Sequence, residues 1–140
     1  MSKKKRPFKK YQEPSDYYKD YMDWPNTWTV GHEDLHIANN LRNHFTPFIQ
    51  SMIADGLAVK TIKNHMLNLS QLALEIIGRL NDEDEGNRKL PIETLLLKYI
   101  DDQNGPLLHH LDPNDSADEA QLKAFDSTCR KLYKYNLLAF

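Results

Sequence analysis

The 140-residue chain has a single cysteine and no apolar run that is nearly long enough to span a bilayer. One cysteine excludes a disulfide within the chain and favours a reducing compartment, so we expect the protein in the cytoplasm. A membrane-spanning helix needs about 18 consecutive apolar residues, and the lack of such a run predicts no membrane segment. There is also no glycine-rich phosphate loop, G-x-S-x-G elbow or paired-cysteine motif. These absences predict no cofactor and no enzymatic function.

One enzyme-like pattern is present. The segment His32-Glu33-Asp34-Leu35-His36 matches H-E-x-x-H, in which two histidines one helical turn apart bind zinc and the glutamate activates water. Here the pattern directly follows Gly31, at an expected helix start, and no apolar run leads into it. No other histidine stands at a recognised spacing for a third ligand. We therefore interpret the match as chance and expect a solvated helix N-terminus without metal.

The net charge of −2 conceals a strong asymmetry. Residues 1–10 contain six lysines and arginines and no acid, whereas the other 130 residues contain 12 basic and 20 acidic side chains. We predict a disordered or extended basic tail over residues 1–23, followed by a single helical domain over residues 24–140. Such a tail is either a solvated extension or a contact for nucleic acid.

Apolar residues recur at helical spacing through most of the domain, and strand-like alternation is nearly absent. The fold class predicted from this pattern is all-α, a four- to five-helix orthogonal bundle with an irregular N-terminal arm. The predicted helices span residues 34–55, residues 59–80, a segment from Pro91 to about residue 104, and a segment from Ser116 to the C-terminal region.

Particular residues predict how these helices begin, bend and end. Pro47 removes a hydrogen bond to Asn43 and predicts a kink or break in the first helix. Gly56 is the expected C-terminal glycine of that helix. Ser116 and Glu119 have the spacing of a capping box for the last helix. The tight joint at Gly56 predicts that the first two helices pack face to face.

The segment Trp24-Pro25-Asn26-Thr27-Trp28 places two large aromatic side chains ahead of the first helix. Pro25 disfavours the α conformation at Trp24, so we predict an irregular segment. Its expected role is to cap the helical core, because each indole ring can bury about 150–250 Å². An exposed aromatic platform for bases or for a partner is the alternative.

The first two predicted helices and their joint, residues 45–77, contain Phe48-Ile49, Gly56-Leu57-Ala58 and Lys60-Thr61-Ile62, followed by Met66, Leu69 and Leu72. This pattern resembles the N-terminal core-binding domain of tyrosine recombinases and phage integrases. That family shows an apolar helix, a Gly-Leu-Ser-like turn, a Thr-Ile step and a long helix. The resemblance implies a helical bundle that clamps one face of duplex DNA. Ala58 departs from the family pattern, which usually has serine there.

The catalytic half of such enzymes is missing from the sequence. That half needs two arginines, a His-x-x-Arg motif and a tyrosine nucleophile. Neither His109 nor His110 is followed by arginine three residues later, and no arginine cluster accompanies Tyr133 or Tyr135. The chain also resembles small bacterial proteins with a Trp-Pro-x-Thr-Trp start and a Cys-Arg-Lys-Leu-Tyr end, a resemblance that implies no activity. We therefore predict a non-catalytic protein.

If the resemblance holds, polar residues outside the apolar stripes should contact double-stranded DNA, since lysine and asparagine reach phosphates and asparagine also reads adenine. The protein would then be DNA-associated, in an accessory role to a mobile genetic element. An ordinary solvated surface carries the same residue types and is the alternative. The predicted contacts are Lys60, Thr61, Lys63, Asn64 and Asn68 on the second helix and Arg130, Lys131 and Lys134 on the fourth.

A second function fits the same sequence. The chain ends in the apolar segment Leu137-Leu138-Ala139-Phe140 and its body is acidic. Leu137, Leu138 and Phe140 would then dock on a protein partner or on another copy of the chain. The alternative prediction is a helical protein–protein interaction or oligomerisation module.

Overall fold

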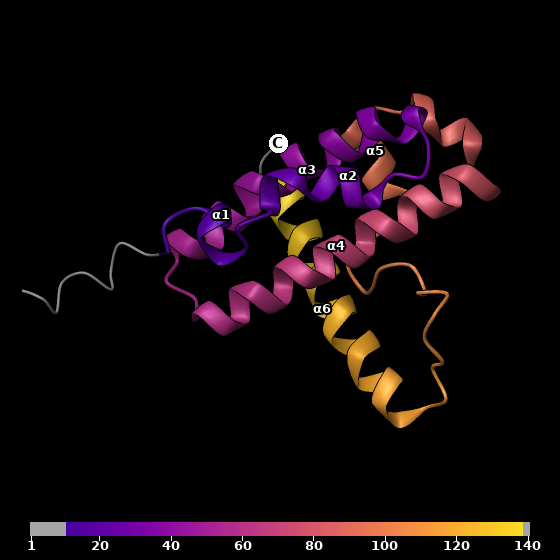
Figure 1. Ribbon diagram of the computed structural model, residues 1–140. Coiled ribbons are helices and arrows are strands. Elements are labelled where there is room, and N and C mark those ends of the chain that lie inside the picture. Colours follow the sequence, from indigo (N-terminus) through magenta and orange to yellow (C-terminus); the bar gives the residue numbers. More distant parts are fainter. Residues whose placement is uncertain (1–10, 139–140) are drawn as a thin grey trace, which may run out of the picture.

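The computed structural model describes residues 11–138, and within them every regular element is helical (Figure 1). Three long helices dominate, and the shorter elements lie before or between them. The predicted all-α fold is therefore confirmed. The elements are α1 (Pro14–Tyr17), η2 (Tyr21–Asp23), α2 (Trp24–Trp28), α3 (His32–Ala54), α4 (Val59–Asp82), η3 (Glu85–Lys89), α5 (Ile92–Leu97) and α6 (Ser116–Leu138).

Helices α3 and α4 form the predicted pair around Gly56. Gly56 has φ +77°, a left-handed conformation that favours glycine because it has no Cβ. Its N–H donates to the carbonyl of Ile53 at 3.0 Å, and the N–H of Leu57 donates to the carbonyl of Met52 at 3.3 Å. These two bonds form the Schellman arrangement that ends a helix and reverses the chain. The apolar stripes of α3 and α4 then meet in one core.

Of the kink or break predicted at Pro47, the break is wrong, because helix α3 continues through this residue. Pro47 and Asn43 both lie on the exposed side of the helix, where water can satisfy the carbonyl that proline leaves without a donor. Phe45, Phe48 and Ile49 are buried on the opposite side of this stretch. Because the residues before and after Pro47 in the sequence pack into the same core, the helix remains continuous.

The prediction of a disordered or extended tail is wrong for residues 11–23. This stretch contains α1 and η2, and Tyr17 and Tyr21 are buried. The Tyr21 hydroxyl lies 2.8 Å from Thr46 Oγ1 and donates to the carbonyl of Arg42 at 3.3 Å, which fixes the arm to α3. The charged residues of this stretch predict a solvated tail, whereas the tyrosine rings supply apolar surface to the core. Residues 1–10, the basic part of the predicted tail, lie outside the described residues.

Trp24 and Trp28 cap the core as predicted, but the segment between them is helical. Trp24 has φ −52° and ψ −40°, so the predicted effect of Pro25 on its conformation is wrong. Pro25 falls in the first turn of α2, where its missing N–H has no helical partner to lose. Both indole rings are buried, and Trp28 Nε1 donates to Ser70 Oγ on α4 at 2.9 Å.

The third and fourth helices differ from the predictions at their ends. Helix α5 stops at Leu97, and the chain continues as a loop that buries Ile100 and Leu108. Helix α6 is capped by Asp115, whose Oδ1 accepts the N–H groups of Ala117 at 3.0 Å and Asp118 at 3.1 Å, so the predicted cap at Ser116 lies one residue too late. Figure 1 shows α6 crossing α4 at a steep angle.

Candidate nucleic-acid interface

The crossing of α4 and α6 is held by a polar contact between residues 63 positions apart. His65 Nδ1 lies 2.7 Å from Thr128 Oγ1, and Asn68 Nδ2 donates to the same hydroxyl at 2.9 Å and to the carbonyl of Ala124 at 3.3 Å. The Thr128 hydroxyl also lies 3.4 Å from the carbonyl of Ala124, so it can donate to that carbonyl or to His65 Nδ1, and the tautomer of His65 sets which of the two is the donor. Burial, followed by the nearby charge of Lys131, lowers the pKa of His65 and favours the neutral ring.

Beside this contact the two helices border an open hollow of about 360 Å³. The first turns of α4 supply one wall and the second half of α6 supplies the other. Four of the eight predicted DNA contacts line it, which brings together residues that the sequence separates by about 70 positions. The lining residues are Leu57, Thr61, His65, Ser127, Arg130, Lys131 and Lys134.

The other four predicted contacts lie outside the hollow. Lys60 and Asn64 are exposed on α4. Lys63 is half-buried, and its ammonium lies 5.5 Å from the centre of the Tyr18 ring, so it faces the N-terminal arm. Both amide hydrogens of Asn68 have partners on α6, so this side chain holds the fold together and is not a free DNA contact.

His65 and Ser127 line the hollow but were not predicted. His65 follows Thr61 by one helical turn, and this i, i+4 spacing could have placed it on the same face. Ser127 has no such signal, because its position depends on the angle at which α6 crosses α4.

The positive charge around the hollow is not neutralised by ion pairs. Over residues 11–138 the ion pairs are Arg79–Glu75, Arg88–Asp34 and His109–Glu75, and none contains a lysine. Lys131 and Lys134 are exposed on consecutive turns of α6. Arg130 is partly engaged, since its Nη1 donates to the carbonyl of Gln103 at 2.9 Å. The hollow therefore presents cations and the Thr61 hydroxyl, which are groups that bind phosphate oxygens.

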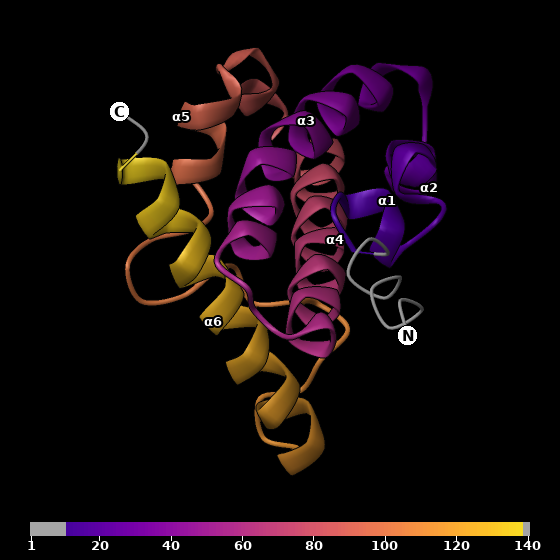
Figure 2. The ribbon, with the colours of Figure 1, turned by 90° about the vertical axis from the view of Figure 1, so that its left-hand side faces the viewer.

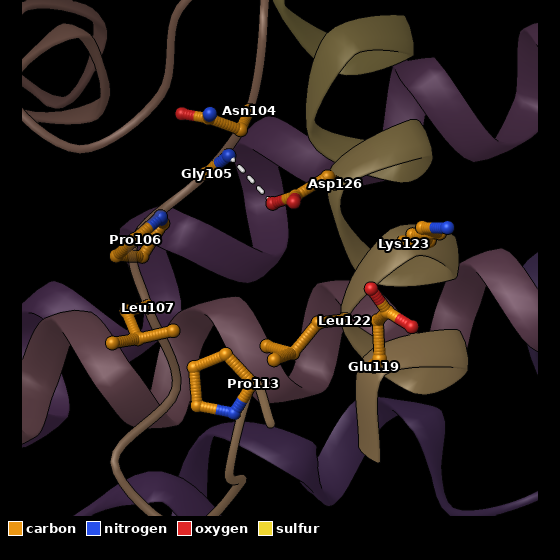
Figure 3. A pocket seen from close by; sticks show the side chains of 9 residues that line it. All are labelled: Asn104, Gly105, Pro106, Leu107, Pro113, Glu119, Leu122, Lys123 and Asp126. Carbon is orange, nitrogen blue, oxygen red and sulfur yellow. Dashed lines mark hydrogen bonds between the residues drawn. The ribbon is translucent and has the colours of Figure 1, made fainter. Parts of the chain in front are cut away.

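A second hollow, of about 430 Å³, lies between α6 and the loop that precedes it (Figure 3). Asp126 accepts the N–H of Gly105 at 3.1 Å across this gap, and burial raises the pKa of its carboxyl group. Glu119 and Asp126 place two carboxylates there against the single cation of Lys123. That balance disfavours a phosphate ligand, so the α4–α6 hollow is the better candidate for DNA.

The H-E-x-x-H segment occupies the start of α3, as predicted. His32, Glu33 and His36 are exposed, whereas the Asp34 carboxylate turns inward and accepts the N–H of Gly31. Among residues 11–138 no three histidine, cysteine or acidic side chains are grouped so that they could hold a metal ion. In the same part of the chain, no helix is long and apolar enough to cross a bilayer.

Comparison with known proteins found no matching family model, no similar curated protein and no similar solved structure. The resemblance of residues 45–77 to recombinase core-binding domains therefore stays a prediction.

Proposed function

We propose that this chain is a non-catalytic helical protein that binds the phosphate backbone of double-stranded DNA, as an accessory protein of a mobile genetic element. The observation that carries the proposal is the α4–α6 hollow, where Thr61 from one helix faces Arg130, Lys131 and Lys134 from another. Such groups position a protein on DNA without reading sequence.

The number of available cations sets the expected strength of the salt dependence. Lys60, Arg130, Lys131 and Lys134 give about four phosphate contacts from the folded body. Each neutralised phosphate contributes about −0.9 to the slope of log K against log salt concentration, so a slope of roughly −3 to −4 is expected. The basic residues 1–10 would add to this slope in the full chain.

The test is fluorescence anisotropy with a short labelled duplex over a series of salt concentrations. The variant K131E/K134E should bind at least about tenfold more weakly, and its salt slope should fall by about 2. The matched control is K19E/K98E, which changes the net charge equally at exposed sites on the arm and at the end of α5. The control should stay within about twofold of the natural chain.

Two results would contradict the proposal. Equal losses in the two charge variants would show that net charge alone attracts the duplex. A chain lacking residues 1–10 that never binds at low salt would show that the folded body has no DNA interface.

Protein association is the second candidate function, and the end of α6 favours it. Leu137 and Leu138 are 54% and 88% exposed, and Phe140 lies outside the described residues. Exposed leucines at a helix end are a common docking element for another apolar surface. Light scattering of the full chain and of a chain lacking residues 137–140 tests this candidate, because loss of the tail should lower the mass of any complex.

A further inference from the structure

The solvent face of α4 carries two leucines that the core does not use. Leu67 and Leu74 are 48% and 42% exposed, and they lie seven residues apart, which places them on the same side of the helix. Gln71 lies between them on that side, and Gly78 follows one turn after Leu74. Neither leucine belongs to the core or to the residues packed against it.

The charges at the two ends of this face have opposite signs. Exposed Lys60 stands two turns before Leu67, and exposed Asp82 stands about two turns after Leu74. Neither side chain forms an ion pair within residues 11–138. A stripe that is basic at its start, apolar in its middle and acidic at its end is complementary to itself when one copy is reversed.

We propose that a second copy of this chain docks antiparallel along the solvent face of α4, related to the first by a twofold axis that passes beside residues 70 and 71. Leu67 of each copy contacts Leu74 of the other. Lys60 of each copy then lies beside residues 81 and 82 of the other, within reach of the Asp82 carboxylate.

The dimer is a weak one. Two leucines from each copy make a small apolar centre, and small interfaces belong to weak or transient complexes. The lysine–aspartate pairs sit at the rim, where they set register and orientation more than affinity. This surface differs from the α4–α6 hollow and from the leucines at the end of α6, and it shares only Lys60 with the proposed DNA contacts. The two proposals are therefore tested separately, the dimer without DNA.

A cysteine at position 71 tests the axis directly. The natural Cys129 is buried, and burial raises its pKa, so it stays unreactive. Under mild oxidation at high chain concentration, Q71C should form a disulfide-linked dimer at least about tenfold faster than the control Q121C, whose thiol would stand on the exposed face of α6. Equal rates for the two variants would overturn the proposal.

Charge reversal tests the register, with the mass in sedimentation equilibrium as the readout and no DNA present. K60E should weaken the dimer by at least about threefold, and K60E/D82K should restore it because each reversed charge again faces its opposite. L67D/L74D should abolish the dimer, whereas L137D/L138D should leave it intact. A monomeric natural chain, a double swap as weak as K60E alone, or a dimer lost only in L137D/L138D would each refute antiparallel docking on α4.

Discussion

Asp34 is a buried carboxylate that accepts four hydrogen bonds. It is 1% exposed and accepts hydrogen bonds from the N–H groups of Val30 (2.9 Å) and Gly31 (3.2 Å), from Asn81 Nδ2 (3.0 Å) and from Arg88 Nη2 (3.0 Å). It therefore joins the start of α3 to the end of α4 and to η3. Burial alone would raise the pKa of Asp34, but the hydrogen bonds outweigh burial and lower it to about 2.

We expect Asp34→Ala to lower the free energy of unfolding by about 3 kcal/mol, because it leaves Arg88 in a mostly buried site without its counter-charge. Since the folded pKa lies below the unfolded one, the stabilisation by ionised Asp34 is present above about pH 4 and is lost as the pH falls towards 2. Urea denaturation at several pH values measures both effects. Asp34→Asn is the control for shape, and this variant should lose the same part of the acid dependence because its amide does not titrate. An unchanged acid dependence would show that another carboxylate is responsible.

Thr128 is the residue on which the α4–α6 crossing depends. Thr128→Val keeps the shape but removes the hydroxyl that His65 and Asn68 share, so two half-buried polar groups lose their partner. Leaving such groups unpaired costs about 1–3 kcal/mol in unfolding free energy. The neighbouring exposed Ser127→Ala should change stability by less than about 0.5 kcal/mol. Chemical denaturation of both variants makes the comparison, and similar values for the two would contradict a structural role for the hydroxyl.

At the scale of elements, the reversal between α3 and α4 depends on one backbone conformation. A Cβ added to Gly56 would meet no atom within 4 Å, so substitution there strains the backbone without a steric clash. Gly56→Ala should therefore destabilise the protein by about 1–2 kcal/mol. Gly86→Ala is the matched control, because a Cβ there also meets no atom within 4 Å and the residue does not have positive φ. Thermal unfolding followed by circular dichroism should show a lower midpoint only for Gly56→Ala.

At the scale of the whole molecule, the N-terminal arm completes the core. Tyr17, Tyr21, Trp24 and Trp28 are all buried against the long helices, and the arm is bonded to both α3 and α4. In Figure 2 the arm lies on one side of the α3–α4 pair and α6 lies on the other. Its removal would expose apolar surface on both members of the pair.

A chain that begins at residue 29 should therefore lose cooperative unfolding, since four large aromatic side chains contribute more than about 5 kcal/mol, which is comparable to the stability of a whole domain. A chain that begins at residue 11 keeps all of these contacts and should melt like the full chain. Calorimetry of the two truncations makes the measurement. A cooperative transition at an unchanged temperature in the shorter chain would contradict the arm's place in the core.

Much of the helical core could be predicted because it depends on local pattern. Leu41 and Phe45 on α3, and Met66 and Leu69 on α4, have helical spacing. Periodicity alone therefore places each pair on the buried face of its own helix. The arm could not be predicted in this way. The burial of Tyr17 and Tyr21 depends on packing against residues far along the chain, which the sequence of residues 11–28 alone does not reveal.

The candidate site likewise has features that local sequence predicts and features that depend on tertiary packing. Thr61 and Lys131 could be assigned separately to polar helix faces, but their meeting at one hollow depends on the crossing of α4 and α6. The sequence predicts Asn68 as a DNA contact, but in the structure its amide donates hydrogen bonds to Ala124 and Thr128 on α6. A polar side chain cannot be assigned to solvent or to an interhelical bond until its neighbours in space are known.

The sequence by itself determined the helical periodicity, the corner at Gly56 and the uneven distribution of charge, because each depends on residues a few positions apart. Only the tertiary structure decided that residues 11–28 complete the core, that Asp34 is buried among four donors, and that His65 meets Thr128 across the helix crossing. These features join groups distant in the chain, and their energies come from burial and pairing that exist only after the helices pack.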